Sequence, residues 1–395
     1  MKKTLLTICL VWMCFSLSAQ KIIDLSGKWS FSIDRQDNGE KEKWFSHTLN
    51  DFINLPGSMP EKQKGDEVTA KTQWTGSLYD SSYYYNPYME KYRKEGNIKF
   101  PFFLTPDKHY VGAAWYQKEV NIPADWKGER ILLFLERPHI ETTVWVNGQK
   151  TGMQNSLCVP HQYDITRYVR PGKCTITIRV DNRIKEINVG PDSHSITDQT
   201  QGNWNGIVGR ICLQTTPKTY FDDIQIYPEP EQKLARVKVV IKGTGTAKVK
   251  LSAESFNTDK KHIVPAIQQE IKLNKGVTET EMVLPMGNDM LLWDEFHPAL
   301  YKLKAEVTNG KKTEIKEIQF GMRRFEIKGK WFYVNGRKTQ LRGTVENCDF
   351  PLTGYAPMDV ESWERVFRIC RSYGLNHMRF HSFCPPEAAF MAAHR

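Results

Sequence analysis

The 395-residue sequence contains few cysteines, and they form no metal-binding or disulfide pattern. Eight are present, and the six that follow the first twenty residues show neither a CxxC pair nor the Cys/His spacing of a zinc site. These six are Cys158, Cys174, Cys212, Cys348, Cys370 and Cys384. The common zinc modules are therefore excluded, we expect no metal ion and no cofactor, and a chain this long needs no disulfide even where one is permitted.

The sequence also lacks a block of like charge. Lys and Arg outnumber Asp and Glu by 55 to 45, but basic residues are scattered among acids and no nucleic-acid-binding motif is present. This excess indicates a solvated basic surface, and no nucleic-acid partner is expected. Hydrophobic residues make up 40% of the chain and aromatic residues 12%, which supplies a packed core and excludes wholesale disorder.

No apolar run is long enough to cross a bilayer comfortably. The longest, Leu5–Phe15, follows Lys2 and Lys3 and precedes the small-residue stretch Ser16-Leu17-Ser18-Ala19. A charged start, a short apolar run and small residues at a cleavage site are typical of a bacterial secretory signal. Residues 1–19 are therefore predicted to be a signal peptide. We expect a periplasmic or secreted protein without membrane insertion.

The length suits two or three domains, and residues 20–218 have the pattern of a β domain. Apolar and polar residues alternate at Trp29, Phe31 and Ile33, and again at Ile176, Ile178 and Val180, while Ile131–Leu135 is continuously apolar. Turn sequences such as Asn147-Gly148 separate these segments. The pattern predicts a β-sandwich of jelly-roll type.

Residues 61–103 interrupt this pattern with a run of aromatic side chains: Trp74, Tyr79, Tyr83, Tyr84, Tyr85, Tyr88 and Tyr92. A long loop without its own periodicity is usually functional or disordered, and this many aromatic rings argue against disorder. Two interpretations stay open. The rings stack on the apolar face of a sugar, or they pack the loop onto the sandwich.

Two further parts follow. Residues 219–320 alternate again, for example at Val237, Val239 and Ile241, and predict an immunoglobulin-like β-sandwich with turns at Gly243-Thr244-Gly245 and Asn309-Gly310. Residues 321–395 predict a hairpin around Asn335-Gly336, then a helix that begins after Asp359 and ends at Gly374. A strand at Asn376–Phe380 and a second helix after Pro385-Pro386 complete a β–α–β–α order typical of a parallel α/β fold.

Several motifs, taken in order, resemble glycoside hydrolase family 2, which includes β-galactosidases, β-glucuronidases and β-mannosidases. The matching blocks include Leu25-Ser26-Gly27-Lys28-Trp29, Val144-Trp145-Val146-Asn147-Gly148, Trp204-Asn205-Gly206, His297-Pro298-Ala299-Leu300-Tyr301, Phe320-Gly321-Met322-Arg323 and Leu375-Asn376-His377-Met378-Arg379. The resemblance implies a jelly-roll β-sandwich, then an immunoglobulin-like β-sandwich, then the first two βα units of a (β/α)8 barrel in residues 321–395.

The resemblance also implies exo-acting, retaining hydrolysis of β-glycosides. That chemistry requires two carboxyl groups about 5–5.5 Å apart, and in this family both are glutamates at the ends of the fourth and seventh barrel strands. A complete barrel takes about 250 residues. Because residues 321–395 have room for two of its eight units, we expect both glutamates to lie beyond residue 395. No catalytic residue is assigned, and the chain is predicted to be inactive alone. Glu346 and Asp349 are expected to serve structure or substrate contact.

Five residues are predicted to bind a β-linked oligosaccharide or glycoside. Arg379 matches the family arginine that orients the nucleophile, and His381 would hydrogen-bond a sugar hydroxyl or hold a neighbouring residue. Asp198, Asn203 and Trp204 lie in a segment that the family places near the sugar, although Trp204 equally suits the sandwich core. The alternative function is a non-catalytic carbohydrate-binding protein. Homo-oligomerisation and the identity of the sugar are left open.

Overall fold

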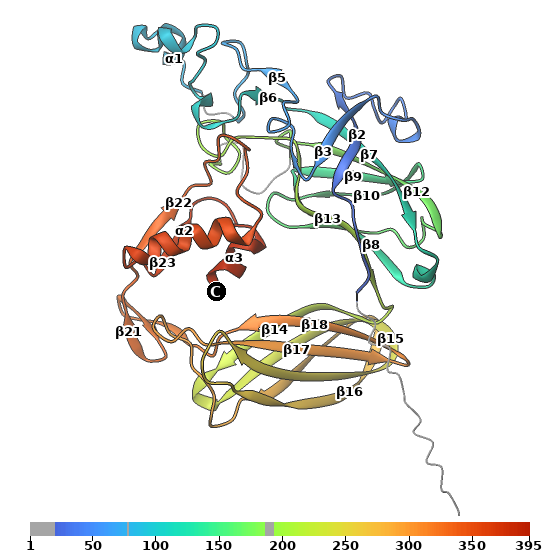
Figure 1. The fold of residues 1–395 in the computed structure, drawn as a ribbon, viewed down its shortest axis with the longest axis vertical. Coiled ribbons are helices and arrows are strands. Elements are labelled where there is room, and N and C mark those ends of the chain that lie inside the picture. Colours follow the sequence, from blue (N-terminus) through green and yellow to red (C-terminus); the bar gives the residue numbers. More distant parts are fainter. Residues whose placement is uncertain (1–19, 77–78, 186–192) are drawn as a thin grey trace, which may run out of the picture.

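The structure, a computed structural model, describes residues 20–76, 79–185 and 193–395, and strands predominate in them (Figure 1). The prediction of a mostly β chain is confirmed. The signal peptide predicted for residues 1–19 lies outside the described residues. No helix in the described ranges is both long and apolar enough to cross a membrane, and all six cysteines after residue 19 are free thiols.

Two antiparallel sheets form the first sandwich. One contains, in spatial order, β1 (Ile22–Asp24), β13 (Gly206–Thr216), β8 (Arg130–His139) and β11 (His161–Asp164), with β4 (Gly57–Ser58) paired to β13. The other contains β10 (Gln149–Asn155), β9 (Glu141–Val146), β12 (Gly172–Asp181), β7 (Ala113–Ile122), β2 (Gly27–Asp34) and β3 (Asp51–Leu55). Both sheets contribute to one hydrophobic core, in which Trp29, Leu133 and Ile178 are buried.

The alternation in the sequence arises from this arrangement, because successive side chains of a strand point to opposite faces of a sheet. The continuously apolar segment Ile131–Leu135 lies in β8, which pairs with a strand on each side. Four of its five side chains are buried, and Phe134 is half-buried because it lines a groove described below.

The aromatic segment forms an insertion in the first sandwich. The antiparallel pair of β5 (Asp66–Glu67) and β6 (Lys108–His109) forms the base of the insertion. Between these two strands lie α1 (Ser82–Tyr85), η2 (Pro87–Tyr92) and η3 (Phe102–Leu104). Three further 3₁₀ turns lie elsewhere, at η1 (Trp44–Ser46), η4 (Ala124–Trp126) and η5 (Pro230–Gln232). The insertion projects from the sandwich at the top of Figure 1.

One curled sheet forms the second sandwich. It contains β14 (Tyr220–Glu229), β15 (Leu234–Phe256), β17 (Leu300–Asn309) and β18 (Lys312–Phe320), and β16 (Ile263–Pro285) pairs with β15 along most of its length. The first half of β15 pairs with β14 and the second half with β17, so the sheet curls around its own core.

The turn predicted at Gly243-Thr244-Gly245 is wrong, since these residues form a bulge inside β15. The register with β16 shifts between Gly243 and Gly245, and Gly245 has φ +84°, a conformation that glycine adopts easily. Because glycine-rich bulges and turns use the same local conformations, the sequence pattern does not separate them. The turn at Asn309-Gly310 is confirmed between β17 and β18.

The C-terminal part begins with a three-stranded sheet of β19 (Phe325–Lys328), β20 (Trp331–Val334) and β21 (Arg337–Thr339). It continues with β22 (Gly343–Glu346), α2 (Val360–Ser372), β23 (His377–Phe380) and α3 (Glu387–Ala393). β22 and β23 pair in parallel, which confirms the predicted β–α–β–α order. The described residues contain this single parallel pair, which does not test the larger barrel that the resemblance implies.

The ends of α2 are those that the sequence predicts. The Asp359 carboxylate accepts a hydrogen bond from the Ser362 backbone at 2.8 Å, which satisfies one of the free amides of the first turn. At the other end, Gly374 has φ +74° and donates to Arg371 O at 2.9 Å, while Leu375 donates to Cys370 O at 3.2 Å. This pair of bonds is a Schellman cap, so the helix is closed at both ends by its own sequence.

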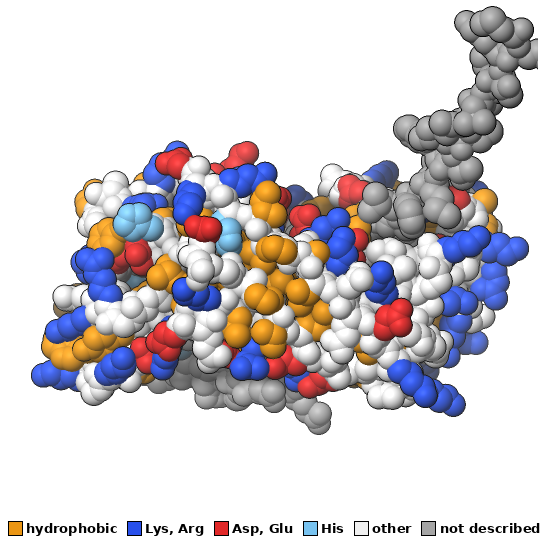
Figure 2. Space-filling model, turned by 90° about the horizontal axis from the view of Figure 1, so that it is seen from below, with side chains coloured by type: hydrophobic (Ala, Val, Ile, Leu, Met, Phe, Trp, Pro, Cys, Tyr) orange, Lys and Arg blue, Asp and Glu red, His pale blue; other side chains and the backbone are white. Residues whose placement is uncertain are grey.

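Figure 2 shows the molecule from below. Charged side chains of both signs are scattered over this face, and hydrophobic side chains gather near the middle of the face. This view agrees with the scattered charge of the sequence.

Candidate functional site

The carboxyl ends of β22 and β23 meet the segment 193–205 of the first sandwich. His381, immediately after β23, donates its backbone amide to Glu346 O at 2.8 Å, so the two strands end together. The Gln201 side chain donates to His381 O at 2.9 Å, and Ser195 Oγ donates to Ser382 O at 2.5 Å. Residues about 180 positions apart in sequence therefore form one site.

Arg379 lies on the exposed face of β23. Its neighbour Phe380 points the other way and packs edge-on against Trp363 of α2 at 5.7 Å. Among the residues that the structure describes, the Arg379 guanidinium has no ion-pair partner. It is thus placed to receive a carboxylate or a hydroxyl from outside its own strand.

The His381 ring is half-buried beside two polar groups. Its Nδ1 lies 2.9 Å from Ser382 Oγ, and its ring centroid lies 5.2 Å from that of His194. Sequence analysis identified His381 but missed His194, Ser195 and Gln201. The only signal for these three is the polar run on both sides of Asp198, which has no helix or strand periodicity to indicate which part of the molecule it contacts.

Two acids lie at the end of β22. Glu346 Oε1 accepts the Cys348 amide at 2.9 Å. Burial and the nearby Glu346 charge both raise the pKa of Asp349, and Asp349 Oδ1 is buried without a hydrogen-bond partner. Because this oxygen is covered by protein, it is not open to a ligand.

Asp198 is fully buried beneath the aromatic insertion. Its Oδ2 accepts the Thr75 amide at 2.5 Å, and its Oδ1 lies 3.5 Å from His109 Nε2. Asp198 Oδ1, His109 Nε2 and Thr75 Oγ1 have no hydrogen-bond partner among residues 20–76, 79–185 and 193–395. Asp198 thus ties the insertion to segment 193–205, and its side chain is covered rather than open to a ligand.

Asn203 and Trp204 are buried in the wall of the first sandwich. Asn203 Nδ2 donates to Asn182 O at 2.9 Å, and its Oδ1 lies 3.1 Å from His139 Nε2. Trp204 stacks on the His139 ring at 4.5 Å and 16°, and lies 5.6 Å from the Tyr355 ring. Complete burial lowers the pKa of His139 to about 3, so the imidazole stays neutral between them. The Trp204 side chain is 6% exposed, so little of it is open to a ligand.

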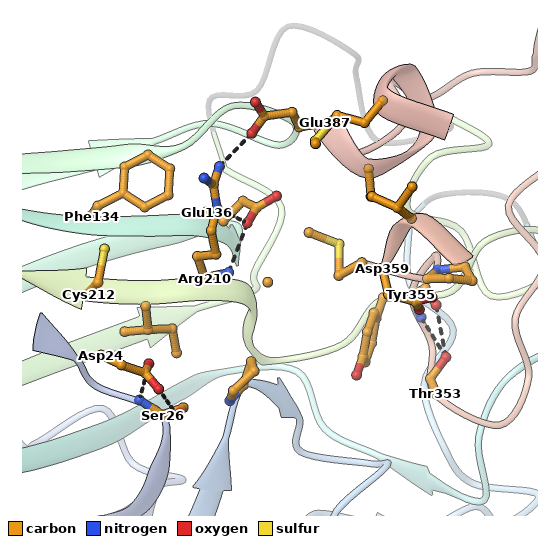
Figure 3. Close-up of a pocket in the computed structure, with 18 of the residues that line it drawn as sticks. Asp24, Ser26, Phe134, Glu136, Arg210, Cys212, Thr353, Tyr355, Asp359 and Glu387 are labelled. Carbon is orange, nitrogen blue, oxygen red and sulfur yellow. Dashed lines mark hydrogen bonds and ion pairs between the residues drawn. The ribbon is translucent and has the colours of Figure 1, made fainter. Parts of the chain in front are cut away.

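A large groove separates the first sandwich from the C-terminal part (Figure 3). Its volume is about 1250 Å³, and its lining is mainly apolar. The contributing apolar side chains include Ile22, Phe134, Ile211, Phe350, Leu352, Met358, Val360, Ala388 and Met391.

The groove is lined by one basic side chain, Arg210, and by five acidic ones, Asp24, Glu136, Asp349, Asp359 and Glu387. Arg210 Nε donates to Glu136 at 2.9 Å, and Arg210 Nη2 reaches Glu387 of α3 at 2.5 Å. Asp24 is held by Ser26, and Asp359 caps α2. The groove therefore combines an apolar surface with an excess of acidic side chains. Among these acids, Asp349 has a buried oxygen without a hydrogen-bond partner in the described residues.

Within the described ranges, no three His, Cys, Asp or Glu side chains are grouped to hold a metal ion.

Two family models match the chain in succession. Residues 22–217 match the sugar-binding domain of glycosyl hydrolases family 2, and residues 219–323 match a second model of glycosyl hydrolases family 2. These ranges coincide with the two sandwiches.

Similar proteins come from several organisms. The chain is 24% identical over 313 residues to a beta-galactosidase of Thermoanaerobacter pseudethanolicus, covering 75% of this chain and 39% of that protein. It is 24% identical over 391 residues to the beta-glucuronidase of Homo sapiens, covering 90% of this chain and 53% of that protein. The chain thus spans about half, or less, of the length of these relatives.

Solved structures share the fold. The beta-glucuronidase of Ruminococcus gnavus superimposes with a TM-score of 0.68 at 19% identity, covering 95% of this chain and 58% of that chain. The beta-glucuronidase of Lactobacillus rhamnosus superimposes with a TM-score of 0.69 at 18% identity, covering 95% and 57%.

Proposed function

The chain belongs to glycosyl hydrolases family 2, and from that premise we propose that it is the N-terminal part of a secreted, exo-acting, retaining β-glycoside hydrolase. The observation that carries this proposal is the succession of two family domains over residues 22–323. The relatives, which include a beta-galactosidase and beta-glucuronidases, support a terminal β-linked sugar as substrate.

The geometry supports a role for Arg379 and His381 in that chemistry. Retaining hydrolysis needs a carboxylate nucleophile and a second carboxyl group that acts first as acid and then as base. An unpaired guanidinium at the end of β23 is suited to orient a carboxylate and keep it ionised through charge-assisted hydrogen bonds. His381, held against β22 by its own amide, is suited to bind a sugar hydroxyl beside it.

We further propose that these 395 residues do not catalyse turnover alone. Of the acids beside the site, Glu346 accepts a backbone amide and Asp349 has one buried oxygen, and the family resemblance assigns neither acid to the catalytic pair. The two sandwich domains would then remain as binding modules without a catalytic pair of carboxyl groups.

Nitrophenyl β-glucuronide, β-galactoside and β-mannoside test this proposal. The purified chain is expected to release nitrophenol at the rate of buffer, with a full-length beta-glucuronidase of the family as positive control. Release well above buffer that disappears in Glu346→Gln would contradict the proposed inactivity and would assign Glu346 to catalysis.

Calorimetry separates the hydrolase fragment from the alternative of a carbohydrate-binding protein. Glucuronic acid and galactose are titrated into the wild-type chain and into Arg379→Ala. Heat of binding that is lost in Arg379→Ala supports a sugar site at the end of β23. Heat that Arg379→Ala leaves unchanged would instead place sugar binding elsewhere on the sandwiches.

Export is proposed from the sequence of residues 1–19 alone. Expression of the whole chain in a bacterial host is expected to yield a periplasmic protein that begins at Gln20. N-terminal sequencing checks this, and recovery of the full-length chain from the cytoplasm would count against it.

A further inference from the structure

The aromatic insertion consists of two layers with different environments. Its inner layer is packed: Tyr83 is 1% exposed, its ring lies 6.0 Å from Trp74 and 5.8 Å from Phe100, and its hydroxyl donates to Tyr92 O at 2.8 Å. Arg93 also stabilises this layer, because its guanidinium donates hydrogen bonds to the carbonyl oxygens of Tyr83 and Asn86. The insertion therefore has a small core of its own.

Four tyrosines form the outer layer, which we name the tyrosine platform: Tyr79, Tyr84, Tyr85 and Tyr88. Their exposed fractions are 59%, 39%, 73% and 85%. Tyr79 and Tyr84 stack on each other at 5.6 Å and 21°, and Tyr84 in turn meets the buried Tyr83 edge-on at 5.0 Å. The inner layer thus holds part of the platform in place while leaving its rings open to solvent.

Packing within the insertion accounts for the inner layer but not for the platform. Single exposed aromatic rings are ordinary on a protein surface, whereas four exposed tyrosines within ten residues, two of them stacked on each other, concentrate apolar surface in the way that binding surfaces do. Tyrosine suits such a surface because its ring is rigid and apolar while its hydroxyl still bonds to polar ligands.

The charge around the platform indicates what it binds. Residues 79–95 contain three acidic and three basic side chains, so this region is neutral in a chain with an excess of basic residues. Flat exposed rings without net charge match the apolar C–H face of a neutral pyranose better than an anionic one. A sugar chain with β linkages presents such faces repeatedly along its length.

The base of the insertion, rather than the platform itself, lies near the C-terminal part of the chain. A groove of about 550 Å³ separates the base of the insertion from the loop that follows β22, and its lining includes Lys99, Phe103, Pro351 and Leu352.

We propose that the tyrosine platform is a binding surface for neutral β-linked polysaccharide, separate from the terminal-sugar site at β23. The inference rests on the proposed function in so far as both assign the chain to glycan processing. It concerns polymer binding without turnover, so inactivity on nitrophenyl sugars leaves it standing.

The test is calorimetric titration of the purified chain with soluble β-1,4-xylan and β-1,4-glucan. Wild type is expected to bind at least one of them, and the double variant Tyr85→Ala/Tyr88→Ala is expected to bind at least five-fold more weakly. Tyr227→Ala is the matched control, because Tyr227 is a 51% exposed tyrosine on β14 of the second sandwich. The control variant should bind as wild type does.

Polygalacturonate forms the anionic arm of the experiment. Binding to this polymer alone, abolished by high salt, would overturn the proposal, because it would reduce the interaction to the basic charge of the chain. The absence of binding to both neutral polymers, or equal binding by the double variant and wild type, would overturn it as well. Unchanged melting temperatures establish that both variants fold.

Discussion

The Trp204 indole lies between the His139 imidazole and the Tyr355 ring, in the wall that separates the first sandwich from the C-terminal part. Its neighbours Asn203 and Asn205 are also buried, and Asn205 Nδ2 donates to the carbonyl oxygens of Gly112 and Val180 at 3.0 Å. The motif Trp204-Asn205-Gly206 therefore fastens strands and loops together. The match of this motif to the family therefore reflects its role in packing and hydrogen bonding at least as much as contact with a sugar.

The substitution Trp204→Ala is expected to lower the free energy of unfolding of the first sandwich by about 3–5 kcal/mol, because it leaves a large cavity. Urea denaturation measures this loss. Trp331→Ala on β20, where the ring is 41% exposed, is the control and should change stability by less than about 1 kcal/mol. A nearly neutral Trp204→Ala would show that the ring is not a packing residue.

Two buried histidines make stability depend on pH. Burial lowers the pKa of His139 to about 3 and that of His161 to about 4, against 6.5 for the unfolded chain. Below pH 6.5 the unfolded chain binds protons that the folded chain does not, so stability is complete above pH 6.5 and falls as the pH decreases toward these values. At pH 5, each histidine is expected to lower the free energy of unfolding by about 2 kcal/mol relative to its value above pH 6.5.

Melting temperatures between pH 7 and pH 5 check this expectation. His161→Gln should reduce the dependence on pH, since one of the two groups no longer titrates. His297→Gln, which alters an exposed histidine next to Asp294, should leave the dependence as in wild type. An equal slope in His161→Gln and wild type would contradict the assignment.

At the scale of elements, α2 is a helix that buries few of its side chains. Trp363 is its one buried residue, and its apolar neighbours Phe367 and Ile369 are half-buried or exposed. Its stability therefore depends strongly on its ends, where the Asp359 cap and the Gly374 turn satisfy free amides and carbonyls.

Asp359→Ala is expected to destabilise α2 by about 1 kcal/mol, because the Ser362 amide loses its acceptor. Hydrogen exchange of the helix amides measures the local change. Asp289→Ala is the control, since Asp289 is a highly exposed acid in a long-range pair with Lys260 at 3.7 Å. Equal protection of α2 in both variants would show that the cap contributes nothing measurable.

At the scale of the whole molecule, the three parts differ in how much core they have. Each sandwich encloses a large buried cluster, whereas the cluster around Trp363 is small and its surroundings expose Val345, Tyr373, Phe390 and Met391. A two-stranded parallel sheet covered on one face by two helices leaves its other face in water. The C-terminal part is thus the least stabilised region of the described chain.

Limited chymotrypsin digestion is expected to cut within residues 343–395 before it cuts the strands of residues 25–320. Tyr373 and Tyr227 provide an internal comparison, because both rings are exposed but Tyr227 lies within a strand of the second sandwich. Mass spectrometry should detect cleavage at Tyr373 first. Equal rates at the two tyrosines would contradict the difference in local stability.

The sequence by itself determined the elements of this protein. Alternation at Trp29 and Phe31, the cap at Asp359 and the closing Gly374 specify strands and helix ends, since these are local properties that follow from backbone geometry. The ordered motifs likewise indicated the family, because each block reflects one short segment.

Only the tertiary structure decided which loops meet. His381, Gln201 and Ser195 come together because the C-terminal part docks against the first sandwich. Asp198 is covered by the aromatic insertion, and Trp204 packs against His139 and Tyr355. A polar loop carries no periodicity that encodes its partner, so these contacts depend on the packing of whole domains. For the same reason, only the structure separated the buried Tyr83 from the exposed Tyr85 and Tyr88, although all three stand within six residues.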